Sequence, residues 1–152
     1  LAASLQAYEA SGEPSNQATA AARERWARWL LDRGRLDAAA TEFERVVTDA
    51  ADKTWAHVAL ARAGRARVAL AKGDMDRADR ESASALEGWS RLTGFQDVRM
   101  QAYLWRVRAA VLERDRSTRE QADALWARAE AASRKTDAPE SPTVLRPREL
   151  QL

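Results

Sequence analysis

The chain has 152 residues, of which 45% are hydrophobic and 32% charged, so it is long enough and apolar enough to fold around a core. Its formal net charge is only +2, which does not by itself predict nucleic-acid binding, because that function needs a concentrated basic patch. The absence of cysteine excludes disulfides and thiolate metal sites, and the absence of a long apolar run excludes a membrane span in this sequence.

The segments between glycines and prolines predict helices and no strand. Alanine, arginine, leucine and glutamate dominate, and these residues favour helix, whereas no alternating apolar run indicates a strand. Six helices are expected at about 16–33, 36–50, 53–72, 75–93, 97–114 and 117–135. Their N-caps are expected at Ser15 or Asn16, Asp52, Asp74 and Ser117. Because the connections are short, neighbouring helices should run antiparallel.

Two similar strings predict a repeated unit. GRLDAAATEFERVV at 34–47 aligns with GDMDRADRESASAL at 73–86, at a period of 39 residues. A weaker third copy, STREQADALWARA at 117–129, follows 44 residues after the second. Each unit should be two helices joined by a turn in which glycine takes the left-handed conformation, while small alanines let the helices approach closely. Such pairs must stack on one another to bury their apolar faces.

These residues resemble the tetratricopeptide repeat family over about residues 16–135. The matches are the Gly-x-Leu/Met-Asp-x-Ala core, an alanine or valine seven residues further on, and Phe43 in the first copy. The proline that usually closes each repeat is missing, the third copy lacks the turn glycine, and the periods exceed the usual 34 residues. Related helical-hairpin repeats therefore stay open. The resemblance implies an all-α fold: antiparallel helical hairpins stacked as a right-handed solenoid of about three repeats.

The expected domain organisation has three parts. Residues 1–14 should be the end of a preceding helix and a linker, 15–135 the repeat domain (15–52, 53–94 and 95–135), and 136–152 a proline-containing tail. Since residue 1 is leucine, we expect a part of a longer protein. The segment 124–144 looks like the C-terminal ends of bacterial proteins that join a serine/threonine kinase to such repeats, or like the repeat regions of bacterial transcriptional regulators. The chain has no kinase motif of its own.

In this family the first helix of each pair lines a concave groove that holds peptides. Here those helices carry nine arginines: Arg23, Arg25, Arg28, Arg62, Arg65, Arg67, Arg99, Arg106 and Arg108. The resemblance places Glu24, Arg28, Ala63 and Arg67 in the groove, and we add Arg106 from the third pair. Inward arginines would suit an acidic or phosphorylated segment; the alternative is a solvated outer face. The lysine and asparagine clamp of chaperone-binding members is not matched, so a chaperone C-terminus is not expected.

Catalytic, metal and cofactor chemistry is not predicted. His57 is the only histidine and has no carboxylate four residues away on either side, so we expect no special role for it. No phosphate-binding glycine loop or catalytic triad can be argued. Six tryptophans should pack between helices, unless one or two serve as partner anchors.

The expected function is non-catalytic protein–protein interaction, as a scaffold or sensor domain of a larger bacterial protein that could itself be an enzyme such as a protein kinase. A homodimer formed through end helices or the C-terminal tail is one alternative, and a nucleic-acid-binding helical repeat that uses the arginines is another, less expected one. We expect a cytoplasmic location, or the periplasm if an anchor precedes residue 1.

Overall fold

The computed structural model describes residues 3, 6, 7 and 10 and the ranges 16–51, 53–94 and 97–135. Within these ranges the chain forms α-helices, one 3₁₀ helix and no strand, which confirms the all-α class. The helices are α2 (Gln17–Asp32), α3 (Leu36–Asp49), α4 (Ala56–Ala71), α5 (Met75–Ser90), α6 (Val98–Leu112), η1 (Arg116–Thr118) and α7 (Arg119–Lys135). None of the described helices has the length and apolar character needed to cross a bilayer. The predictions for Ser15, Asp52, 136–152 and most of 1–14 lie outside the described residues.

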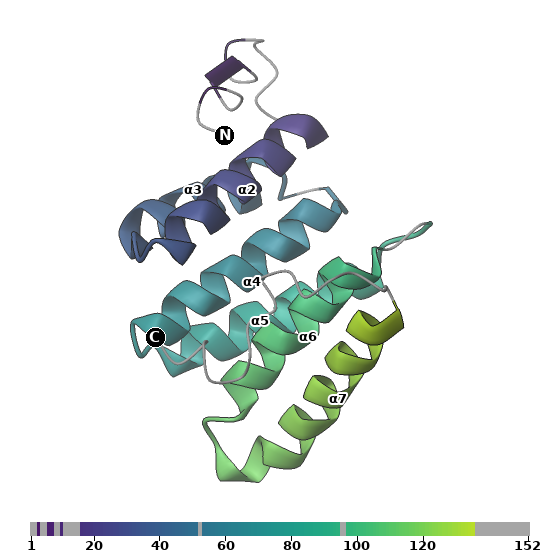
Figure 1. Ribbon diagram of the computed structural model, residues 1–152. Helices are drawn as coiled ribbons and strands as arrows, with labels where there is room; N and C mark the ends of the chain where they lie inside the picture. Colours follow the sequence, from purple (N-terminus) through teal and green to yellow (C-terminus); the bar gives the residue numbers. More distant parts are fainter. Residues whose placement is uncertain are drawn as a thin grey trace.

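The helices pack in the order in which they occur along the chain. Each helix contacts the next, and α4 also contacts α2 and α6. Figure 1 shows the pairs α2/α3, α4/α5 and α6/α7 following one another as layers. The helices α2, α4 and α6 therefore form a continuous row, with α4 in the middle.

The turns within the first two pairs have the same construction. Gly34 and Gly73 have φ of 73° and 77°, in the left-handed region, as expected from the repeat. The next residue closes each turn, because the Arg35 N–H donates to the Leu30 carbonyl at 3.0 Å and the Asp74 N–H to the Ala69 carbonyl at 2.9 Å. These bonds span five residues, as in a Schellman motif, and satisfy the last carbonyls of the helix.

The helix starts follow the predicted caps only in part. Asn16 accepts from the Thr19 N–H at 2.8 Å and Asp74 from the Arg77 N–H at 3.1 Å, which confirms both N-caps. The prediction for Ser117 is wrong. The turn between α6 and α7 contains the 3₁₀ helix η1 rather than a glycine. Asp115 caps η1 by accepting from the Ser117 N–H at 2.9 Å.

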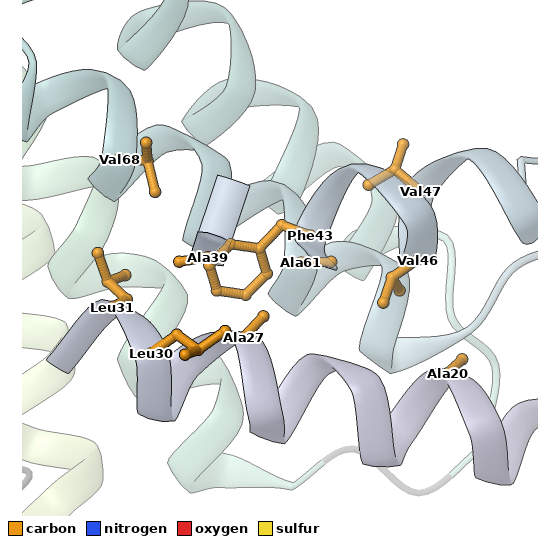
Figure 2. Close-up of a cluster of buried hydrophobic side chains, with 10 residues drawn as sticks. All are labelled: Ala20, Ala27, Leu30, Leu31, Ala39, Phe43, Val46, Val47, Ala61 and Val68. Carbon is orange, nitrogen blue, oxygen red and sulfur yellow. The ribbon is translucent and has the colours of Figure 1, made fainter. Parts of the chain in front are cut away.

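The core consists of small residues at repeat-equivalent positions, packed around a few large ones. Ala39, Ala78 and Ala122 have no exposed surface. Seven residues further on, the side chains are also buried, and these are Val46, Ala85 and Ala129. Figure 2 shows Phe43 at the centre of the first cluster, between side chains of α2 and Ala61 of α4. A Cβ added to Gly64 would lie 2.3 Å from the Phe43 ring, so glycine is the residue that lets α3 and α4 approach here.

Candidate binding face

The row formed by α2, α4 and α6 carries a group of connected polar and aromatic side chains. The guanidinium carbon of Arg28 on α2 lies 5.8 Å from the ring centroid of Tyr103 on α6, within cation–π range. The hydroxyl of Tyr103 lies 3.5 Å from a guanidinium nitrogen of Arg67 on α4. Side chains from the two outer helices of the row thus meet over the middle one. We call this group the binding face, and it consists of Glu24, Arg28, Asp32, His57, Arg67 and Tyr103.

Arg67 is the residue that connects all three helices. Its guanidinium donates to Asp32 on α2 at 3.3 Å and to the hydroxyl of Tyr103 on α6. Only 12% of the Arg67 side chain is exposed. Burial alone lowers the pKa of Arg67, but the neighbouring Tyr103 hydroxyl and Asp32 carboxylate raise it, and the pKa ends above its ordinary value. The contacts with Asp32 and Tyr103 hold the Arg67 guanidinium in a defined position.

Glu24 is a buried carboxylate that two side chains approach. Its side chain is 1% exposed, and its oxygens lie 3.3 Å from Nε of Arg28 and 3.7 Å from Nδ1 of His57. A carboxylate buried in this way needs such neighbours, because desolvation of an isolated charge is costly. Helical spacing placed no carboxylate four residues from His57, and the one that lies near it, Glu24, comes from α2 rather than from a neighbouring turn of α4. The spacing along one helix could not identify this pair.

Of the five residues predicted for the groove, the structure brings together three, Glu24, Arg28 and Arg67. Ala63 has no exposed surface and packs in the core against α5 and α6, so its side chain cannot contact a partner. Arg106 instead donates to the hydroxyl of Ser133 on α7. Burial lowers the pKa of Arg106.

Several of the other arginines point away from the binding face. Arg23 pairs with carboxylates of α3, Arg65 with those of α3 and α5, and Arg108 with Asp79 of α5. Arg25 and Arg99 are exposed. The face itself holds two guanidiniums and two carboxylates, so its formal charge is balanced rather than strongly positive.

The aromatic residue of the face is Tyr103, which the sequence alone did not single out. All six tryptophans pack against the core, and Trp89 is almost completely buried. Packing between helices is thus the arrangement that the structure favours for tryptophan. Tyr103 could have been identified only by aligning α6 with α2 and α4, and the irregular turn after α6 removes the glycine on which such an alignment depends.

The part of the chain that the structure describes holds no group of three or more histidine, aspartate or glutamate side chains placed to bind a metal ion. Comparison of the chain with protein-family models found no match, and comparisons with curated proteins and with solved structures found none either. The resemblance to tetratricopeptide repeats therefore depends on the residues quoted above.

Proposed function

We propose that this chain is a tetratricopeptide-like helical-repeat domain that binds a protein or peptide segment along the face of α2, α4 and α6. In this proposal the repeats are 15–52, 53–94 and 95–135, stacked as a right-handed solenoid. The two identical glycine turns and the buried alanines at equivalent positions support it. The domain acts as a non-catalytic scaffold or sensor within a larger bacterial protein.

The meeting of Arg28, Arg67 and Tyr103 across three helices is the observation that carries this proposal. Side chains of α2 and α6 reach each other over α4, as expected for the inner side of a curved stack. About a third of the Arg28 side chain and 42% of the Asp32 side chain are exposed. A segment lying across the row can therefore contact guanidinium, carboxylate and aromatic groups together. Aromatic residues and arginine are enriched among those that dominate binding energy at protein interfaces.

The balanced charge of the face indicates which charge the bound peptide segment should carry. Both guanidiniums already have carboxylate partners, Glu24 for Arg28 and Asp32 for Arg67. A carboxylate of the ligand would have to share or replace Asp32, the more exposed of the two acids. We infer a segment that carries one or two acidic side chains among neutral ones, rather than a continuous acidic run.

Selection of segments from a displayed library of random 12-residue peptides, with the 152-residue chain as bait, tests the proposal. The selected peptides are then titrated by fluorescence anisotropy against Tyr103→Leu and Trp105→Leu. Both variants shorten a half-buried aromatic side chain of α6, but Trp105 packs toward α7, away from the binding face. We expect Tyr103→Leu to weaken binding about tenfold or more, as for an interface hot spot, and Trp105→Leu to change it less than twofold. Equal effects, or no enriched peptide, would contradict the proposal. Circular dichroism shows whether both variants keep the helical content of the parent chain.

A further inference from the structure

A cavity of about 370 Å³ lies between the N-terminal half of α4 and the C-terminal half of α5. Its basic lining residues are Lys53, Arg62 and Arg91, and Glu87 is the one acidic residue among them. Trp55 and Val58 contribute apolar surface. The volume falls in the range of about 300–1,000 Å³ that is usual for small-molecule sites. A small ligand can therefore enter a space in which positive side chains predominate.

Arg62 differs from the other arginines that the fold covers. Seven arginines in the described ranges are buried or half-buried. Five of them have a carboxylate within ion-pair distance, namely Arg23, Arg28, Arg65, Arg67 and Arg108. Arg106 donates to a serine hydroxyl. Arg62 alone of the seven makes no hydrogen bond or ion pair with the described residues. An arginine that lines a cavity and has no anionic partner among the described residues is available to an anion supplied from outside.

The acid in the cavity does not neutralise Arg62. Glu87 pairs with Arg91 one turn further along α5, and 61% and 66% of these two side chains are exposed. An exposed pair of this kind is weak and is screened by solvent. Arg62 therefore keeps a positive charge that no carboxylate of the described residues compensates.

We propose that this cavity binds the phosphate or carboxylate groups of a small polyanionic molecule, with Arg62 as the principal contact. The planar guanidinium can donate two parallel hydrogen bonds to either kind of group. Arg91 at the end of α5 and Lys53 before α4 add positive charge on either side.

The cavity is separate from the binding face. Arg62 and Arg67 are five residues apart on α4, which places their side chains about 140° apart around the helix axis. A partner segment on the face and an anion in the cavity would therefore contact opposite sides of α4. Either proposal can fail without the other.

Isothermal titration calorimetry of the 152-residue chain with inorganic pyrophosphate and, separately, with citrate tests the inference. Both are run at 150 mM NaCl, where charges more than about 8 Å apart are largely screened. We expect saturable binding of at least one of them at a ratio of one ligand per chain, and the two arms show whether the site takes phosphate or carboxylate groups. Binding of neither, or heats that do not saturate, would overturn the proposal.

Two variants identify the site. Arg62→Gln should weaken binding about tenfold or more, because it removes a charge-assisted pair of hydrogen bonds. Arg128→Gln, which alters an exposed arginine of α7 outside the cavity, should change it less than twofold. If Arg62→Gln fails to fold, Arg62→Lys serves instead and should still weaken binding severalfold, because lysine lacks the planar fork. Equal weakening by the cavity variant and by Arg128→Gln would show non-specific attraction and would overturn the proposal.

Discussion

Replacement of Gly64 by alanine should destabilise the protein, although alanine is the better helix former. An added Cβ would lie 2.3, 2.4 and 2.6 Å from three ring atoms of Phe43. Favourable carbon–carbon contacts are about 3.5–4.0 Å, so the ring or the α4 backbone must move by about 1 Å or more. Phe43 has no exposed surface and is enclosed by α2, α3 and α4, so the ring has no free space to enter.

The change in the free energy of unfolding for Gly64→Ala follows from two opposed contributions. Overpacking of a core costs about 1–3 kcal/mol, and three close ring contacts place Gly64→Ala at the upper end. The change from glycine to alanine within a helix contributes about 1 kcal/mol of stability. We therefore expect a net loss of about 2 kcal/mol, which lowers Tm by about 4–8 °C in a chain of this size.

Gly88 provides a matched control within α5. A Cβ added there would meet only the Cβ of Ala59, at 3.9 Å, an ordinary contact distance. Gly88→Ala should therefore gain about 1 kcal/mol. The two substitutions are chemically identical, and the structure predicts opposite signs for them.

Urea denaturation followed by circular dichroism measures both variants and a third, Phe43→Leu. Leucine lacks the distal ring atoms, so Gly64→Ala should cost less in that background than in the parent chain. If Gly64→Ala is as stable as Gly88→Ala, or if its cost is unchanged by Phe43→Leu, the described packing of α3 on α4 is refuted.

Three further predictions concern a cap, an acid and the binding face. Asp74→Ala should cost about 1 kcal/mol in urea denaturation, because it removes the side-chain acceptor at the start of α5. The backbone and side-chain hydrogen bonds from Ser117 lower the pKa of Asp115 below 3.8. The stability that ionised Asp115 contributes is thus complete above pH 3.8 and is lost as the pH falls through the lowered pKa. Asp115→Asn still accepts the hydrogen bond but does not titrate, so it should remove this part of the pH dependence of stability in urea denaturation. Tyr103→Phe should cost about 1 kcal/mol of thermal stability, since Arg67 loses one acceptor; an unchanged Tm would mean that this contact does not contribute.

The helices, their turns and their core positions could be predicted from the sequence because they depend on local patterns. Gly34 and Gly73, each two residues before the start of a predicted apolar helix side, specified the left-handed turns. Small residues at fixed spacing indicated which side of each helix is buried. The third turn could not be predicted in the same way, because residues 116–118 form a 3₁₀ helix capped by an aspartate.

The candidate site was less predictable because it depends on contacts between helices that are distant in the sequence. The pairing of Glu24 with His57 and of Arg28 with Tyr103 requires the register of α2, α4 and α6 relative to one another. Arginines on the same helix also point in different directions. Arg65 and Arg67 are only two residues apart, yet one pairs with acids of α3 and α5 and the other lies on the binding face.

Amide chemical-shift mapping of the ¹⁵N-labelled chain, titrated with a selected peptide, tests the proposed function most directly. We predict that the largest changes lie at and around Arg28, Arg67 and Tyr103, on α2, α4 and α6 together. The same titration on Tyr103→Leu should shift these signals only at higher peptide concentration. Changes confined to α3 and α5, or to one helix of the row, would contradict binding along this face.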